Sequence, residues 1–404
     1  MNILVCNCGS SSLKYRLLTM PEENEISAGE AQRIGPVTAE PARIVHRESG
    51  RETVHTMDLP NHQKAFHEIL SLLEKGGKRP DAVGHRVVHG GRLFEQPAVI
   101  TPTVFGALRQ VRNLAPLHNP PAIDLIEECQ TRYPTLPQVA VFDTAFHTTI
   151  PEHARQYALP LDLVQELNIR KYGFHGTSHQ YVVEEAAKMA GIPMADFNAV
   201  SCHLGSGGAS LCAISKGRSI DNTMGYTPLQ GLVMSTRCGD LDPAIVMKLL
   251  SLYSGDMDRI EDVLNRRSGV LGLSGASADI RDILGNWDAA TSRDDPFQKT
   301  LQIYLWRIRK YLGAYLTLAG PVQAIIFTDT IGESVSLVRS IVCANQNYFG
   351  VCIDEKSNRE LNQLPGDISQ AGSPVRILVI ATNEELAIAR QVFRTLSLNN
   401  KVKQ

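Results

Sequence analysis

Apolar strand-like runs and turns of small polar residues alternate along the chain, and the first such unit is the most regular. Residues 3–6 are apolar and enter a Gly/Ser turn, beyond which Leu13, Tyr15 and Leu17 alternate with charged residues. This period of two predicts a hairpin. Its tip can direct backbone N–H groups and hydroxyls toward an anion, with Lys14 as a nearby charge. An ordinary hairpin with a Ser-rich turn is the simpler alternative.

The same plan recurs in the second half of the chain. Residues 199–203 form an apolar run, residues 205–208 form a Gly/Ser turn, and the apolar residues 211–214 lead away from it. Two such hairpins in two halves predict a duplicated α/β fold with a cleft between the halves. The pattern loosens around residue 150, where we place a domain boundary.

Helical spacing and end signals predict several helices. They cover residues 64–75, residues near 121–130, the segment from Ser178 (N-cap) to Gly191 (end), the segment opened by Asp242 and Pro243, an amphipathic stretch over 297–318, and a last helix opened by a Thr382–Glu385 capping box. We expect the aromatic face of the 297–318 helix to be core. Residues 355–374 are polar and predict a surface loop.

Two charged residues lie within or directly after apolar strands. Arg86 is inside an apolar strand, and Asp143 ends the buried run 139–142. The carboxyl ends of strands in α/β folds are where ligands and metals are held. An arginine within a strand needs an anion, and a structural Arg–carboxylate pair satisfies it. Glu384 is equally explained as a first-turn acid that the helix dipole favours.

Composition limits the classes of protein. A chain of 404 residues exceeds one ordinary core, so two domains are expected, and 43% apolar with 20% charged residues is typical of a globular protein. A formal charge of −2 argues against a nucleic-acid or membrane-surface binder. No run reaches the roughly 18 apolar residues of a spanning helix, and no signal peptide is expected. Eight scattered cysteines without a C-x-x-C pair favour reduced thiols in the cytoplasm.

Seven ordered motifs together resemble the acetate kinase family, which includes the propionate kinases. They are residues 7–14 (NCGSSSLK), 84–91 (GHRVVHGG), 114–120 (LAPLHNP), 142–147 (FDTAFH), 172–179 (YGFHGTSH), 236–243 (TRCGDLDP) and 382–385 (TNEE). The resemblance covers essentially the whole chain. It implies a two-domain α/β fold like that of actin, hexokinase and Hsp70, a duplicated ribonuclease H-like fold with an interdomain nucleotide cleft, in a homodimer. Residues 1–150, completed by the helix 383–404, would be the acyl/phosphate domain, and residues 151–382 the nucleotide-binding domain.

The resemblance also implies site residues by position. The implied catalytic residues are Arg86, Asp143, His175, Arg237 and His118, and those around Mg²⁺ (Mn²⁺ as the alternative) are Asn7, Asp143 and Glu384, with the carboxylates acting largely through water. The hairpin near the phosphates would contribute Ser10, Ser12 and Lys14, and the nucleotide turns His203, Gly205, Ser206, Gly207, Thr330, Ile331, Gly332 and Glu333. An apolar pocket for the alkyl end of the acid would be lined by Val88, Leu117, Phe174 and Pro228.

The implied activity makes chemical sense. A small carboxylic acid has a pKa near 4, so at pH 7 it is already an ionised nucleophile and needs no general base. The obstacle is repulsion between this anion and a polyphosphate, and phosphoryl transfer is driven by positioning and charge neutralisation. We therefore predict an enzyme that moves the γ-phosphoryl group of ATP, with Mg²⁺, to acetate or propionate by direct, reversible in-line transfer. The expected partners are small molecules only.

The sequence departs from the family pattern at the nucleotide turns. Position 206 is Ser where relatives usually have Asn, and the turn after it is one residue longer. Thr330 and Ser334 replace Gly and Asn, and Arg92 replaces an acid. These changes motivate an alternative function, a degenerate family member that binds nucleotide or acid with little or no kinase activity. A nucleotide clamp related to actin or chaperone ATPases is a more distant alternative, since it leaves Arg86 and the apolar pocket unexplained.

Overall fold

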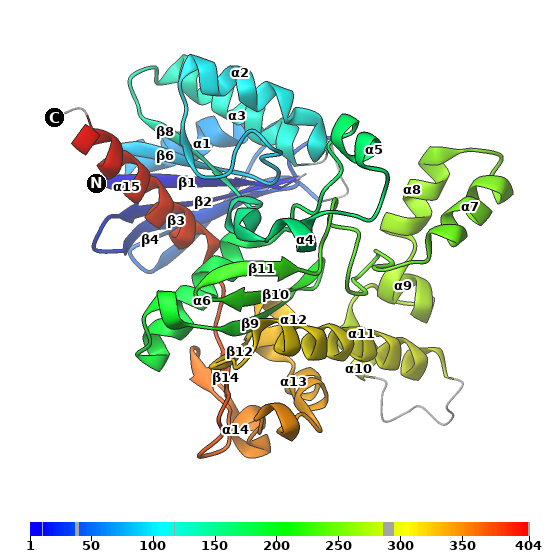
Figure 1. The fold of residues 1–404 in the computed structure, drawn as a ribbon. Helices are drawn as coiled ribbons and strands as arrows, with labels where there is room; N and C mark the ends of the chain where they lie inside the picture. Colours follow the sequence, from blue (N-terminus) through cyan, green and yellow to red (C-terminus); the bar gives the residue numbers. More distant parts are fainter. Residues whose placement is uncertain (10, 37–39, 117, 286–294, 403–404) are drawn as a thin grey trace. The chain divides into compact units, whose positions relative to one another are not determined.

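The structure is a computed structural model that describes residues 1–9, 11–36, 40–116, 118–285 and 295–402. The chain divides into two compact units (Figure 1). Unit 1 comprises residues 1–145 and 383–404, and unit 2 comprises residues 146–382. The two ends of the chain therefore belong to the same unit.

Unit 1 is built on a mixed sheet with the strand order β5-β4-β3-β2-β1-β6-β8-β7. The strands are β1 (Asn2–Cys8), β2 (Ser12–Thr19), β3 (Asn24–Gln32), β4 (Arg43–Glu48), β5 (Arg51–Thr56), β6 (Ala82–Val87), β7 (Ala98–Val99) and β8 (Gln138–Phe142). The predicted hairpin is confirmed, because β1 and β2 pair antiparallel with Asn7 opposite Lys14. Strands β1, β6 and β8 are parallel, so their carboxyl ends meet at one edge.

Helices cover both faces of this sheet (Figure 1). They are α1 (His62–Lys75), α2 (Pro102–Gln110), α3 (Asn119–Arg132) and α15 (Glu384–Val402). The apolar faces of α1 and α3 pack on Leu4, Cys6 and Val83. The intervening residues of the same strands face the other way, and α15 contacts β1, β6 and β8. The side chain of Arg86 therefore lies on the face covered by α15, and Gly84 approaches α15 on the same face.

Unit 2 repeats the central plan with the strand order β11-β10-β9-β12-β14-β13. Its strands are β9 (Ala199–Leu204), β10 (Ala209–Ser215), β11 (Arg218–Asn222), β12 (Ala324–Thr328), β13 (Gly366–Asp367) and β14 (Arg376–Val379). Strands β9 and β10 form the second predicted hairpin, and β9, β12 and β14 are parallel. Each unit thus places an antiparallel hairpin beside a parallel strand.

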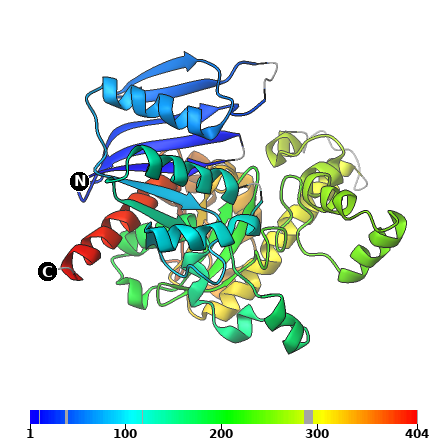
Figure 2. The ribbon, with the colours of Figure 1, turned by 90° about the horizontal axis from the view of Figure 1, so that it is seen from above.

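The helices of unit 2 pack around this sheet and extend from it. They are α4 (Glu152–Arg155), α5 (Leu161–Glu166), α6 (Gly176–Ala190), α7 (Pro243–Leu252), α8 (Met257–Arg266), α9 (Gly269–Ser274), α10 (Ile280–Gly285), α11 (Pro296–Ala319), α12 (Asp329–Ser334), α13 (Ser336–Cys343) and α14 (Glu355–Glu360). The aromatic stripe of α11 is buried, as predicted, and α11 contacts β9 and β10. Helices α7 and α8 stand away from the unit 2 sheet (Figures 1 and 2).

Three local predictions are wrong. Ser178 does not cap α6, because the helix begins at Gly176 after His175, whose φ is +57°, and the Ser178 hydroxyl bonds to His203 instead. The last helix is opened by Asn383 rather than Thr382, since the Asn383 Oδ1 atom accepts a hydrogen bond from the Leu386 N–H at 3.1 Å. The segment 355–374 is not a plain loop, because it contains α14 and the short strand β13.

All eight cysteines carry free thiols, in agreement with their scattered spacing. No helix in the described ranges has the length and apolar character needed to cross a bilayer.

Gly84 sets the distance between β6 and α15. A Cβ atom built on Gly84 would lie 2.7 Å from Val392 Cγ2 and 3.0 Å from Ile388 Cγ2. We expect Gly84→Ala to lower the free energy of unfolding by about 1–3 kcal/mol through overpacking, measured as a shift of the urea midpoint. The matched control is Gly106→Ala in α2, where a Cβ meets nothing within 4 Å and a gain of about 0.5–1 kcal/mol is expected. Equal stability of Gly84→Ala and wild type would contradict this packing.

Candidate functional site

In unit 1, polar side chains gather at the carboxyl ends of the parallel strands. Asn7 is near the end of β1, Arg86 near the end of β6, and Asp143 directly follows β8. The two-residue period of strands puts all three on the face covered by α15, whose first residue is Glu384. The sequence therefore brings four predicted site residues together from segments that are far apart in the chain.

Arg86 is the centre of this cluster. Its Nε atom donates to Asp143 Oδ1 at 3.1 Å, its Nη2 atom donates to Asp143 Oδ2, and its Nη1 atom donates to Asn7 Oδ1 at 3.0 Å. Glu384 Oε2 lies 3.7 Å from Arg86 Nε and accepts from Asn7 Nδ2 at 3.4 Å. The bidentate pair with Asp143 is the strong geometry for an arginine and a carboxylate.

The charges of the cluster compensate one another. Burial lowers the pKa of the Arg86 guanidinium, but the carboxylates of Asp143 and Glu384 outweigh this effect and hold the pKa above its usual value. Asn7, Asp143 and Glu384 present only oxygen acceptors and one amide, which are the ligand types that Mg²⁺ prefers. Within the described residues no group of three His, Cys, Asp or Glu side chains is close enough to hold a metal directly. The donor set therefore fits Mg²⁺ that keeps several of its waters, because Arg86 already donates hydrogen bonds to both carboxylate oxygens of Asp143.

The hairpin tip beside this cluster is only partly described. Ser10 lies outside the described residues. The Gly9 N–H donates to the Ser12 carbonyl at 2.9 Å, and a Cβ on Gly9 would lie 2.8 Å from Ser12 Oγ, so a side chain there would displace the Ser12 hydroxyl. Lys14 is exposed on β2 opposite Asn7. A role of Ser12 and Lys14 with phosphate stays a prediction.

Unit 2 shows the same arrangement at its own parallel strands. His203 is near the end of β9, Asp329 directly follows β12, and Thr382 lies beyond the end of β14. Helix α6 adds His179, and His175 precedes the helix. His203 Nε2 lies 2.9 Å from Asp329 Oδ2, and the Thr382 hydroxyl donates to Ser178 Oγ at 2.9 Å.

The histidines of unit 2 form one hydrogen-bonded network with buried serines. His175 and His203 face each other with ring centroids 4.1 Å apart. Ser210 Oγ lies 2.9 Å from His175 Nδ1 and 2.8 Å from His179 Nε2, so one hydroxyl fixes two imidazoles. Because hydroxyls both donate and accept, they set the tautomer and the ring orientation of these histidines.

Arg237 lies beside this network. A Cβ built on Gly208 would be 3.4 Å from His175 Nε2 and 3.5 Å from Arg237 Nη1, so His175 and Arg237 border the same turn. Arg237 donates to the Pro228 carbonyl at 3.1 Å, and burial lowers the pKa of its guanidinium. In the part of the chain that the structure describes, Arg237 forms no ion pair. A cation held in this way favours an anionic ligand.

The remaining predicted residues are distributed over both units. Val88 and His118 belong to unit 1, and Phe174 and Pro228 belong to unit 2, while Leu117 lies outside the described residues. The Phe174 side chain is buried, and its carbonyl lies 2.9 Å from His147 Nε2. An apolar acid pocket formed by this set stays a prediction.

The nucleotide turn 330–333, expected as a polar turn, is the short helix α12. Buried Arg339 anchors it by donating from Nη1 to the carbonyls of Gly332 at 2.9 Å and Glu333 at 2.8 Å. Its Nε atom donates to Asn358 Oδ1 at 2.7 Å. Glu333 Oε1 accepts from the N–H groups of Asp329 and Thr382, and burial raises the pKa of Glu333.

Sequence reasoning missed five members of the unit 2 network. They are Ser178, His179, Ser210, Asp329 and Thr382. The i, i+4 spacing of His175 and His179 could have placed both near one face of a helix. Asp329 follows a buried strand directly, as Asp143 does, so the same strand-end argument could have found it.

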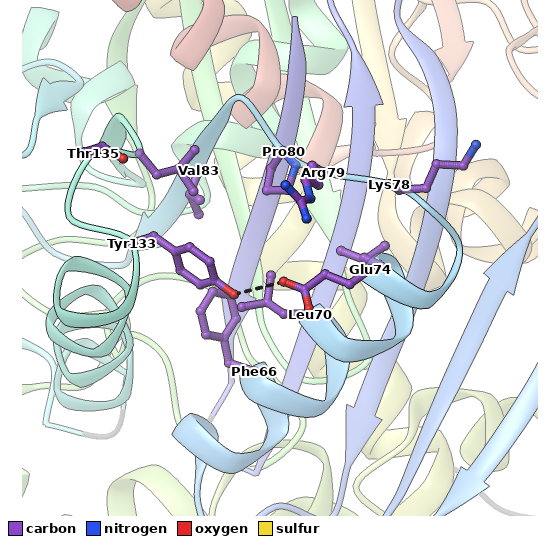
Figure 3. Close-up of a pocket in the computed structure, with 11 residues that line it drawn as sticks. Phe66, Leu70, Glu74, Lys78, Arg79, Pro80, Val83, Tyr133 and Thr135 are labelled. Atoms are coloured by element: carbon purple, nitrogen blue, oxygen red, sulfur yellow. Dashed lines mark hydrogen bonds between the residues drawn. The ribbon is translucent and has the colours of Figure 1, made fainter.

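A cavity of about 330 Å³ lies elsewhere in unit 1 (Figure 3). Its floor is the apolar core residues Phe66, Leu70 and Val83, and Tyr133 Oη donates to Glu74 Oε1 at its side at 3.4 Å. None of the predicted site residues lines it. The cavity is a gap between α1, β6 and the end of α3 rather than part of the polar cluster.

Comparisons with known proteins show which family the chain resembles in sequence and in structure. The sequence pattern of the acetokinase family matches residues 2–390. The acetate kinase of Acetivibrio thermocellus is 46% identical over 98% of this chain and 99% of its own length. The crystal structure of Porphyromonas gingivalis acetate kinase superimposes with a TM-score of 0.90 at 36% identity, covering 98% of this chain and 99% of that one. A propionate kinase from Francisella tularensis gives a TM-score of 0.88 at 36% identity, covering 96% and 98%. The predicted two-domain α/β fold, like that of actin, hexokinase and Hsp70, is confirmed.

His179 gives the site a pH-dependent stability. Burial lowers its pKa well below the usual value, and the neighbouring His147 and His203 add to the effect. Below about pH 6.5 the unfolded chain takes up a proton that the native imidazole refuses, so native stability falls as pH decreases. We expect His179→Gln to reduce the slope of unfolding free energy against pH below 6.5 by up to about 1.4 kcal/mol per pH unit, measured by urea unfolding. Exposed His153→Gln is the matched control, and an unchanged slope for His179→Gln would refute a neutral His179.

Proposed function

The chain belongs to the acetokinase family and is a kinase, and from this premise we propose that it transfers the γ-phosphoryl group of ATP to a short-chain carboxylate. The proposed reaction is reversible, uses Mg²⁺, and makes the acyl phosphate of acetate or propionate by direct in-line transfer. Relatives named for both acids support these two as substrates. An extra methylene in an apolar pocket is worth only about 1–3 kcal/mol, so both acids belong in the first assay.

The observation that carries the proposal is the arginine-centred cluster of unit 1. Arg86 is held by Asp143 and Asn7 at the strand ends, with Glu384 at 3.7 Å. A cation among carboxylates at this edge provides charges of both signs for an acyl group, a phosphoryl group and a metal. The acid arrives ionised, so the carboxylates of this cluster are not required as general bases and can act by pairing with Arg86 and with a metal.

The chain's own residues would act by holding charge. Arg86 and Arg237 would donate to the acid and to the transferring phosphoryl oxygens, and His175 would support the same oxygens, its ring fixed by Ser210 at 2.9 Å. When bound, Mg²⁺ supplies positive charge to the phosphate oxygens. Asn7, Asp143 and Glu384 would hold it through their oxygens and its waters. The acid itself arrives ionised, so no residue has to remove a proton.

The nucleotide is proposed to bind in unit 2. His203, the turn 205–208 and the α12 residues Thr330–Glu333 lie at its strand ends, where α/β sheets hold ligands. The homodimer also stays a proposal. Helix α7 supports it because its apolar residues Ile245, Met247 and Leu252 are exposed in the single chain.

The activity has a direct assay. The chain, incubated with ATP, Mg²⁺ and acetate or propionate, is expected to form an acyl phosphate that hydroxylamine traps as the hydroxamate. Because charge neutralisation on the phosphates drives the transfer, chelation of Mg²⁺ with EDTA should abolish the product and excess Mg²⁺ should restore it. No hydroxamate above the blank with either acid would favour the degenerate, binding-only alternative.

The two arginines have a separate test. Arg86→Ala and Arg237→Ala should each lower kcat by roughly 10²–10³, the usual loss when one charge-stabilising donor is removed. Circular dichroism should show that both variants still fold, although Arg86→Ala is expected to lower the free energy of unfolding because Asp143 loses its partner. Arg→Lys variants should recover part of the rate because the charge remains. The matched control in unit 2 is the exposed Arg218→Ala. A variant that retains nearly the full rate would refute the role given to that arginine.

A further inference from the structure

The carboxylate of Asp329 is held in a fixed place by the local backbone conformation and by hydrogen bonds within the first turn of α12. Asp329 has a φ of +62°, in the left-handed region that side chains rarely adopt. Its Oδ1 atom accepts from the Thr330 N–H at 2.6 Å and from Thr330 Oγ1 at 2.9 Å, and its own N–H donates to Glu333 Oε1 at 2.8 Å. These contacts aim the other oxygen, Oδ2, away from α12.

Asp329 Oδ2 lies within hydrogen-bond distance of a ring nitrogen of His203. His203 Nε2 lies 2.9 Å from Asp329 Oδ2, and His203 Nδ1 lies 2.9 Å from Ser178 Oγ. The Thr382 hydroxyl donates to Ser178 Oγ, which leaves the Ser178 hydrogen for His203 Nδ1. The His203 Nε2–H therefore donates to Asp329, and no donor of this buried imidazole remains for another ligand.

The same oxygen lies against the Gly/Ser turn that follows β9. A Cβ atom built on Gly205 would be 2.5 Å from Asp329 Oδ2, and the Gly205 N–H donates across the turn to the Gly208 carbonyl at 3.0 Å. Burial alone would raise the pKa of Asp329, but the bonds from His203 and Thr330 outweigh it and hold the pKa well below its usual value. An anion is therefore fixed at the turn proposed to receive the phosphates of the nucleotide.

We propose that Asp329 is a specificity-determining residue that weakens the binding of the phosphate donor according to its charge. The carboxylate repels the phosphate chain and accepts the hydrogen bond that His203 Nε2–H could otherwise donate to a phosphate. This inference rests on the proposed nucleotide site of unit 2. The expected physical effect of the departure from the family pattern around residue 330 is weaker binding of highly charged phosphate donors at this turn.

The test compares ligands that differ only in phosphate. Dissociation constants of ATP, ADP and adenosine are measured by calorimetry for wild type and Asp329→Asn, since Asn keeps the size and tolerates the positive φ. We expect ATP and ADP to bind roughly five- to tenfold more tightly to Asp329→Asn, because one negative charge beside the phosphates is removed, with adenosine unchanged. Exposed Glu360→Gln is the matched control for removing one negative charge from unit 2.

A second variant checks the mechanism. Asp329→Gly removes the acceptor as well as the charge and tolerates the positive φ, so it frees the His203 donor. In a His203→Gln background the gain from Asp329→Gly should shrink, because that donor is absent. In the kinase assay Asp329→Asn should lower the KM for ATP and leave the KM for the acid unchanged. Unchanged or weaker ATP binding, including weakening only with Mg²⁺, overturns the inference, and so does an equal gain for adenosine.

The two proposals fail in different ways. If wild type forms no hydroxamate but Asp329→Asn still binds ATP more tightly, the kinase proposal fails and the inference stands. If wild type forms hydroxamate and the ATP affinity of Asp329→Asn does not improve, the inference fails and the kinase proposal stands.

Discussion

A buried guanidinium must be paired, and the pairing of Arg86 determines how unit 1 is assembled. Desolvating a cation inside a sheet is costly, and removing one partner of such a pair is strongly destabilising. Asp143 accepts two hydrogen bonds from Arg86, and Asn7 Oδ1 accepts a third. Glu384 of α15 lies 3.7 Å from Arg86 Nε and adds a second carboxylate. The strand order β1-β6-β8 brings these partners within reach, so the sheet topology and the charge balance depend on each other.

Unit 2 solves the same geometric problem with different chemistry. Its parallel strands also end in polar residues, but the network there is made of imidazoles and hydroxyls around His179 and Ser210, with Arg237 at its border. Imidazoles linked through hydroxyls hold a defined orientation without a large desolvation cost. The site residues of unit 1 therefore form a cluster of paired charges, and those of unit 2 present oriented donors beside Arg237, for which no ion pair is found among the described residues.

Much of this could be predicted from the sequence because period and turn chemistry are local. The two hairpins, α1 and α11 follow from alternation, helical spacing and end residues. Asn7, Arg86, Asp143 and Glu384 were found through motifs, and their meeting follows from parallel strand ends. The start of α6 could not be predicted, because the left-handed turn at His175 and the bond from Ser178 to His203 depend on a partner from β9. The strand-end position of Asp329 could have been predicted, but its pairing with His203 could not, since the two residues are 126 positions apart in the chain.

The division of the chain has a consequence for biosynthesis. Unit 1 contains segments that precede and follow unit 2 in the sequence, and α15 covers the sheet face that carries Gly84 and Arg86. When the ribosome has finished Asp143, that face is still bare, and it remains so until all of unit 2 has been translated. Glu384 then arrives with the last helix. The cluster of Asn7, Arg86, Asp143 and Glu384 can thus be completed only after unit 2 has been synthesised.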